Sequence, residues 1–388
     1  MPETSVHTKP FQEALDYFRE KVNLPTKTWR DIQHGAHAKA FVVAGAMKED
    51  MLSSFREAID KAIAQGTTLE EFRKDFDKIV ASAGWSYKGT RGWRTRTIFA
   101  TNIQTAYAAG RYKQMTDPDV LKRRPYWQYL VGDSKKHRKE HLQWNGLILR
   151  ADDPFWETHY PPNGWGCKCR VRSLSEQDLE RMGSKPDTAP KGSEGVHQDW
   201  KYNVGEAAWG NPFAKRILKE NGKPLYEWRD VTPEKSFAYE KETENIPEIV
   251  TKTRQIQASE TAVECQAVIE KIMGGEKRKE YQRTDPTGAI VSVVPESLAK
   301  HVLESHHTED IPFIPELIEN PSEIWVTFEK EKNGKYRIRK KYIGRFMEGK
   351  ERFRILVAEG EKGVFKTITN FKRRNINRAR NGICIYKK

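Results

Sequence analysis

The sequence has 388 residues, of which 31% are charged and 11% aromatic, and its mean hydropathy is −0.81. This length is too great for one compact core, so it predicts two or three domains, and 11 Trp residues favour a folded chain over a disordered one. The absence of an apolar run of about 18 residues argues against a membrane-spanning protein. The first residues also lack the basic-then-apolar layout of a signal peptide, so we expect a soluble protein that is cytosolic when it is made.

The positive charge is concentrated at one end of the chain. The whole sequence has a net charge of +14, and Ser322–Lys388 contains 20 Lys or Arg against 7 Asp or Glu, a net +13. A localised positive field attracts polyanions and speeds their capture. The pattern therefore predicts nucleic acid, either RNA or packaged DNA, as a partner of this end alone.

The first 182 residues are predicted to be mainly helical. Residues 1–90 form an N-terminal helical region, because apolar residues recur at helical spacing over 51–63 and again over 69–80, after Gly66. A capping box at Thr67 or Thr68 starts the second helix. Residues 91–182 form a second region with a helix over 93–115, whose small residues allow a neighbouring helix to approach closely. A short strand follows Pro125, and another helix starts near 173.

The rest of the chain is predicted to be a linker followed by an α+β domain. Residues 183–245 have weak periodicity and several Pro and Gly, so they are interpreted as a linker or loosely packed arm. Residues 246–388 begin with a helix over 258–273 and continue with four strands that form an antiparallel meander. A short helix over 372–380 and a last strand over 383–387 complete the domain. The fold class of the whole chain is α+β.

Three groups of residues between Asp133 and Arg170 form the most distinctive motif. They are Asp133, Arg138 and His141, then DPFW at 153–156, then PPNGWGCKCR at 161–170. Their order, together with segments upstream, resembles the phage Mu F-like head-morphogenesis family over about residues 10–182. The resemblance implies a low-copy structural protein of the phage head that acts in capsid assembly near the portal.

The thiols of Cys167 and Cys169 are candidates for metal binding. The four Cys of the chain are too few and too scattered for a disulfide framework. Two thiols one residue apart can bind one tetrahedral ion only on a tight turn, which nearby glycines permit. The predicted zinc ligands are Cys167, Cys169, His141 and Asp133, with His137 as the substitute for Asp133. A metal-free packed turn and a nucleophilic Cys167 with His141 as its base remain alternatives.

The basic domain carries the residue types that a metal-independent ribonuclease needs. Attack by the 2′-OH of RNA requires a general base, a general acid and cations for the charged phosphorane. His301 is the candidate acid or base, and Lys341 and Arg345 are candidate phosphate clamps. Further predicted nucleic-acid contacts are Arg354, Lys366, Lys372, Arg373, Arg374 and Arg380. No cofactor is expected for this domain.

The same domain resembles the barnase/EndoU/colicin/RelE-like nucleases found at the C-termini of some phage head proteins. The resemblance rests on LAKHVLESHH, on IPELIENPSEIWV and on TITNFKRRNINRARNGICIY. The family's pattern of a His on the N-terminal helix, with Arg or Thr on later strands, implies catalytic roles for His301, Thr369 and Arg378.

These features together predict a phage minor head protein with a basic module that binds RNA and cleaves it. Two alternatives stay open: a purely structural capsid protein whose basic module binds packaged DNA or the portal, and a nuclease toxin or effector on a head-protein platform. The expected partners are portal and capsid proteins and nucleic acid, with no membrane. The expected location is the procapsid or virion, and the bacterial cytoplasm during assembly.

Overall fold

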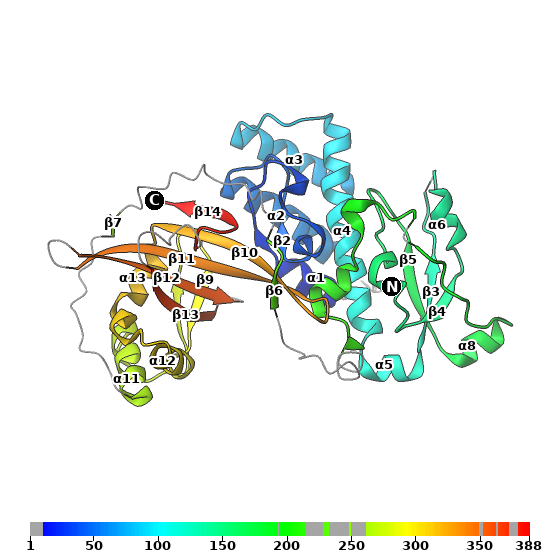
Figure 1. Ribbon diagram of the computed structural model, residues 1–388. Helices are drawn as coiled ribbons and strands as arrows, with labels where there is room; N and C mark the ends of the chain where they lie inside the picture. Colours follow the sequence, from blue (N-terminus) through cyan, green and yellow to red (C-terminus); the bar gives the residue numbers. More distant parts are fainter. Residues whose placement is uncertain are drawn as a thin grey trace, which may run out of the picture. The chain divides into compact units, whose positions relative to one another are not determined.

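The computed structural model describes residues 11–134, 136–192, 194–214, 228–232, 248–249, 261–348, 352–361, 364–371 and 379–388 (Figure 1). The chain divides into two compact units. Unit 1 takes in the described parts of Met1–Arg229 with Lys330–Tyr336, and unit 2 those of Asp230–Glu329 and Arg337–Lys388. The described residues contain no helix with the length and apolarity needed to cross a membrane.

Unit 1 is built mainly from helices. Its helical elements are α1 (Gln12–Arg19), η1 (Trp29–Asp31), η2 (His34–Ala38), α2 (Glu49–Gln65), α3 (Leu69–Ala83), α4 (Arg91–Met115), α5 (Pro118–Arg123), α6 (Lys139–Gln143), α7 (Trp156–His159), α8 (Glu176–Arg181), η3 (Gln198–Trp200) and α9 (Val204–Trp209). Its strands are β1 (Val22–Asn23), β2 (Ala40–Phe41), β3 (Tyr126–Leu130), β4 (Ile148–Arg150) and β5 (Arg170–Leu174). The predicted helices over 51–63, 69–80 and 93–115 are confirmed as α2, α3 and α4.

Local sequence signals explain why these helices begin and pack where they do. The Thr68 side chain accepts a hydrogen bond from the backbone of Glu71, whose carboxylate bonds back to Thr68, so the second of the two predicted capping boxes starts α3. Gly110 of α4 faces α1, where an added Cβ would lie 2.8 Å from the backbone nitrogen of Ala14. The small residue therefore permits the close approach of two helices, as predicted.

The start of the expected linker belongs to the core of unit 1. Trp200 is only 2% exposed, α9 packs against α4, and the Trp209 indole donates a hydrogen bond to the carbonyl of Ala109 over 3.1 Å. The interpretation of 183–245 as a linker or loosely packed arm is therefore wrong for residues 200–209. Periodicity missed it because the apolar residues lie on short helices of one or two turns. Residues 215–227 and 233–247 lie outside the described residues.

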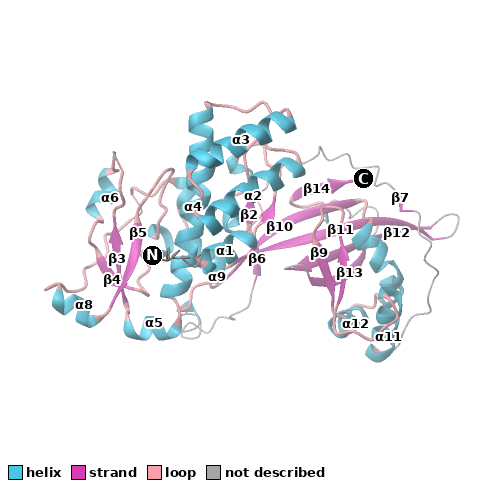
Figure 2. Cartoon of the chain, turned by 180° about the vertical axis from the view of Figure 1, so that it is seen from behind, coloured by secondary structure: helices cyan, strands magenta, loops and turns pink. Residues whose placement is uncertain are grey.

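Unit 2 combines a long sheet with helices. Its helices are α11 (Ala262–Met273), α12 (Pro295–Glu304), η4 (Thr308–Phe313) and α13 (Ile314–Glu319). Its strands are β6 (Trp228–Asp230, of which only Asp230 belongs to unit 2), β7 (Glu248–Ile249), β8 (Tyr281–Thr284), β9 (Ile290–Val293), β10 (Glu323–Glu331), β11 (Tyr336–Glu348), β12 (Arg352–Glu361), β13 (Val364–Phe371) and β14 (Ile383–Lys387). Both views show α11 and α12 on one side of the sheet (Figures 1 and 2).

The strand order of unit 2 is β14-β10-β11-β12-β13-β9-β8. The predicted meander is confirmed, because β10 to β13 are neighbours in chain order, and the predicted last strand is β14. The expected helix over 372–380 falls mostly outside the described residues. The α+β fold class is confirmed.

One buried ion pair fastens the C-terminal segment to β10. Arg380 donates hydrogen bonds to both carboxylate oxygens of Glu323, and the two side chains are 3% and 2% exposed. The Trp325 indole donates a further bond to the same carboxylate over 2.8 Å. The prediction of Arg380 as a nucleic-acid contact is therefore wrong, because its guanidinium is enclosed and neutralised inside the protein.

We expect Arg380→Ala to lower the free energy of unfolding of unit 2 by about 3–5 kcal/mol, because it leaves the Glu323 carboxylate buried without its partner. Hydrogen exchange of the β14 amides, followed by mass spectrometry, measures the effect within unit 2. The control is Arg278→Ala, which removes an exposed pair with Glu276 and is expected to change nothing measurable. Exchange of β14 as slow in Arg380→Ala as in Arg278→Ala would contradict a stabilising role for the pair.

Candidate metal centre and nucleic-acid interface

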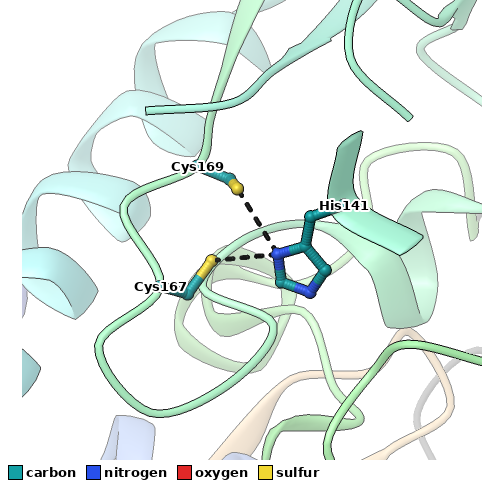
Figure 3. Close-up of side chains that lie close together, drawn as sticks. All are labelled: His141, Cys167 and Cys169. Atoms are coloured by element: carbon teal, nitrogen blue, oxygen red, sulfur yellow. Dashed lines mark hydrogen bonds between the residues drawn. The ribbon is translucent and has the colours of Figure 1, made fainter. Parts of the chain in front are cut away.

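Two cysteines and one histidine converge beside the three-stranded sheet of unit 1, whose strand order is β4-β3-β5. Cys169 directly precedes β5, Cys167 lies two residues earlier, and His141 lies on α6, which follows β3. The His141 Nδ1 atom lies 3.8 Å from Cys167 Sγ and 3.5 Å from Cys169 Sγ (Figure 3). All three ligand atoms lie within 4.8 Å of one another. The structure therefore brings together His141, Cys167 and Cys169, three of the four residues predicted as metal ligands.

A buried asparagine shapes the loop that carries the cysteines. The Asn163 side chain is 0% exposed and accepts a hydrogen bond from the Tyr129 hydroxyl over 2.9 Å. Its amide donates to the carbonyls of Thr158 and Tyr160, so the loop is tied to β3, to α7 and to the residue after α7. The Pro-Pro-Asn-Gly run is therefore a rigid support for the thiols.

Two glycines make the turn of the cysteines sterically accessible. A Cβ at Gly132 would overlap the carbonyl of Lys168, so only glycine lets the chain after β3 pass the residue between the two cysteines. Gly166 has a φ of +66°, a left-handed conformation that side-chain-bearing residues adopt at a cost. The Cys167 amide closes the turn onto the carbonyl of Gly164 over 3.0 Å.

The His141 ring is fixed in orientation. Its Nε2 atom lies 3.1 Å from the carbonyl oxygen of Gly195. A carbonyl only accepts hydrogen bonds, so Nε2 carries the proton, and Nδ1 of the neutral ring presents its lone pair to the two sulfurs. The ring also stacks on Trp144 with a centroid distance of 5.0 Å and an interplanar angle of 22°.

The two thiols divide their protons unequally. The hydrogen bond from the Cys167 thiol lowers the pKa of Cys169 to about 4. The same hydrogen bond and burial raise the pKa of Cys167. The site thus stabilises negative charge on sulfur, which suits a cation ligand.

Asp133 does not join this cluster. Its side chain is exposed, and neither the group of ligand atoms nor the residues that line the adjacent cavity include it. That cavity has a volume of about 290 Å³, and His137, Arg138, His141 and both cysteines line it. The prediction of Asp133 as a ligand does not fit this geometry. Arg138, a residue of the same motif, donates a hydrogen bond to the carbonyl of Trp165 over 2.8 Å and so braces the cysteine loop.

The sheet of unit 2 separates the residues predicted to act together in catalysis. Tyr342 and Phe346 of β11 belong to the hydrophobic core that also contains Leu298 and Val302 of α12. Since strand residues alternate between faces, Lys341 and Arg345 lie on the face opposite that core. His301 lies on α12, so the predicted grouping of His301 with Lys341 and Arg345 does not form.

The cations of β11 fall into two classes because of this alternation. Lys340, on the helix-covered face, lies 3.0 Å from the carboxylate of Asp285. The Tyr342 hydroxyl donates to the same carboxylate over 2.8 Å. On the opposite face, Arg337 and Arg339 both contact Glu329, and Arg337 is only 8% exposed. The odd-numbered row continues with Lys341 and Arg345, which are half-buried.

Several predicted residues fall outside what the structure describes. Lys372, Arg373, Arg374 and Arg378 lie outside the described residues. Arg354 belongs to β12, and Lys366 and Thr369 belong to β13, but their side chains are likewise outside the described part.

Known proteins resemble the chain in both units. The family described as Phage Mu protein F like protein matches residues 53–172. The Mu-like prophage FluMu F protein of Haemophilus influenzae is 30% identical over 364 residues, which cover 79% of this chain and 85% of that protein. The chain belongs to the phage Mu F-like family.

A second Mu F-like relative matches a shorter stretch. Protein F of Escherichia phage Mu, to which its name assigns capsid assembly, is 39% identical over 188 residues. The match covers 45% of this chain and 42% of that protein. No solved structure shows a significant match to the chain.

The C-terminal part of this Mu F-like chain matches a different family. Residues 267–387 match the phage Barnase-EndoU-ColicinE5/D-RelE like nuclease2 family, which agrees with the predicted resemblance. The match includes α12, which carries His301, and β11, which carries the row of Arg337, Arg339, Lys341 and Arg345, called the basic row below.

Sequence reasoning missed two parts of these sites. The carbonyl of Gly195 carries no recognisable signal, because any residue supplies a backbone oxygen and this one lies 54 positions from His141. Arg337 and Arg339 could have been found, because the alternation of KYRIRKKYIGR places them in one row with Lys341 and Arg345.

Proposed function

We propose that this Mu F-like protein acts in head assembly of a phage and that unit 2 binds nucleic acid through the basic row of β11. Family membership supports the first part, together with the capsid-assembly role in the name of the phage Mu relative. The expected partners are portal and capsid proteins, and the expected location is the procapsid or virion.

We expect the protein to sediment with procapsids in lysates of cells in which the phage assembles, because a head component is retained by the shell it helps to build. Sucrose-gradient fractions probed with an antibody against the chain measure this. A lysate prepared from cells that lack the major capsid protein is the control and should leave the protein at the top of the gradient. A pool that remains wholly free in both lysates would contradict the head role.

The observation that carries the nucleic-acid proposal is the row of cations on the face of the sheet opposite the helices. Arg339, Lys341 and Arg345 follow one another on β11 at intervals of two or four residues, so their side chains project from the same face. Glu329 compensates part of the charge at the Arg337 end of the row. Lys341 and Arg345 lie farther along the same face and are half-buried, and their replacement tests whether this face binds phosphate.

We expect the double variant Lys341→Ala with Arg345→Ala to bind RNA more weakly and with a shallower dependence on salt. Each phosphate contact to a single strand contributes a slope of about −0.7 in a plot of log affinity against log salt. Loss of two contacts should therefore reduce the slope by about 1.4. Fluorescence anisotropy with a labelled single-stranded RNA over a salt series measures the slope.

The matched control is Lys300→Ala, which removes a cation that pairs with Glu296 on α12. This variant should keep the slope of the unaltered chain. Equal slopes in the double variant and the unaltered chain would contradict binding at this face. A parallel series with duplex DNA shows whether RNA or packaged DNA is the preferred partner.

Cleavage of RNA is a second candidate function, supported by the match to a nuclease family and by one unusual feature of His301. The Nε2 atom of His301 is buried and has no hydrogen-bond partner among the described residues. A histidine imidazole can accept a proton from a 2′-OH or donate one to a leaving 5′-oxygen, and this role requires that RNA gain access to the Nε2 atom. Lys341 and Arg345 lie on the other face of the sheet, so they bind RNA elsewhere than at His301.

We expect the full chain to cleave tRNA in the presence of EDTA, and His301→Ala to slow cleavage by about 10²–10⁴-fold, the contribution of a general acid or base. The control is His306→Asn, because His306 has a φ of 57°, which Asn tolerates. Gel analysis of tRNA fragments over time measures the rates. Binding without cleavage by the unaltered chain would leave unit 2 as a binding module, and equal loss in both variants would exclude His301 as a specific catalytic group.

A further inference from the structure

We propose that unit 1 binds one zinc ion through Cys167 Sγ, Cys169 Sγ and His141 Nδ1, with a water molecule as the fourth ligand. The three side chains come from two segments, α6 and the loop before β5, so the ion would fasten this loop to the helix (Figure 3). The site is separate from the basic row of unit 2 and does not depend on nucleic-acid binding.

The separations of the ligand atoms match a tetrahedral ion. Zinc bonds of about 2.3 Å to sulfur and 2.0–2.1 Å to nitrogen, at a tetrahedral angle, place each sulfur about 3.6 Å from the nitrogen. The observed distances from His141 Nδ1 are 3.8 Å to Cys167 Sγ and 3.5 Å to Cys169 Sγ. The two sulfurs, like the other atom pairs, lie within 4.8 Å of each other. The two distances from nitrogen to sulfur therefore lie within a few tenths of an ångström of the tetrahedral value.

The histidine is prepared for metal binding by its other nitrogen. A zinc-bound imidazole typically donates its remaining N–H to a carbonyl or carboxylate, which fixes the tautomer and the ring plane. Here the Gly195 carbonyl accepts that proton, and the stack on Trp144 restricts ring rotation. The Nδ1 atom thus lies within reach of both sulfurs in the orientation that a ligand nitrogen needs.

The fourth position faces the cavity of about 290 Å³ beside the cluster. Asp133 lies outside the lining of this cavity, whereas His137 belongs to it and is an exposed side chain. Water has direct access there, so we assign the fourth position to water. Each thiol that still carries a proton releases it to solvent when the ion binds, and two thiolates then balance the charge of the dication.

The donor set favours zinc over the hard cations Mg²⁺ and Ca²⁺. Thiolates are soft ligands that Mg²⁺ and Ca²⁺ avoid, and two sulfurs with one imidazole in tetrahedral arrangement suit Zn²⁺. A disulfide between the two cysteines is the competing use of the thiols, but both are free in this structure.

The test is the zinc content of the full chain, purified without chelator and measured by mass spectrometry of the metal. We expect about one zinc per chain, and nearly complete loss in Cys167→Ser, Cys169→Ser and His141→Ala, because each removes one of the three protein ligands. The matched controls are His137→Ala, from the same cavity, and Cys384→Ser, a buried thiol of unit 2. Both should retain about one zinc.

A second measurement on the unaltered chain guards against variants that fail to fold. Replacement of the metal with Co²⁺ should give the thiolate-to-cobalt charge-transfer band and the intense visible bands of a tetrahedral ion. Absence of both zinc and these cobalt bands in the unaltered chain would overturn the proposal. Loss of zinc in Cys384→Ser equal to that in Cys167→Ser would also overturn it, and loss in His137→Ala would overturn the assignment of water to the fourth position.

Discussion

The orientation of the His141 ring is the constraint on which the centre of unit 1 depends. The Gly195 carbonyl holds the proton on Nε2, and this bond leaves Nδ1 as the only ring nitrogen that can face Cys167 and Cys169. Asn163 supplies the matching constraint from the other side, because its buried side chain fixes the loop that ends in the two cysteines. Without either constraint, the Nδ1 atom and the two sulfurs would no longer be held close together.

Short sequence motifs predicted which residues belong to this site. Contacts between residues far apart in the sequence determine how those residues are arranged. Cys-x-Cys with neighbouring glycines indicates a tight turn, and His141 was a candidate from its motif. Asp133, with His137 as its substitute, was the candidate for a further ligand, because sequence spacing does not tell which way a side chain points from a loop. The structure distinguishes them: His141 points to the sulfurs, and Asp133 is exposed.

The same division between local and distant information applies to the fold. Helical periodicity and the capping box predicted α2, α3 and α4, because both signals lie within a few residues of the elements they specify. The packing of Trp200 and Trp209 against the core was not predictable in this way. Their partners lie about a hundred positions away in the case of Trp209 and Ala109, and short helices leave too little periodicity to detect.

Net charge alone overstated the surface available to nucleic acid. Arg380 is enclosed with Glu323, and Lys340 is paired with Asp285 on the helix-covered face, so neither contributes an open phosphate site. Strand alternation then assigns Lys341 and Arg345 to the opposite face, away from α12 and His301. The β11 cations are thus divided between two faces of one sheet, and this division could not be read from composition.

X-ray absorption at the zinc edge of the full-length protein tests the central claim about the thiol–imidazole centre most directly. We predict two sulfur neighbours at about 2.3 Å and two lighter neighbours, the imidazole nitrogen and a water oxygen, at about 2.0–2.1 Å. A first shell that contains only nitrogen and oxygen would contradict the assignment of Cys167 and Cys169 as ligands.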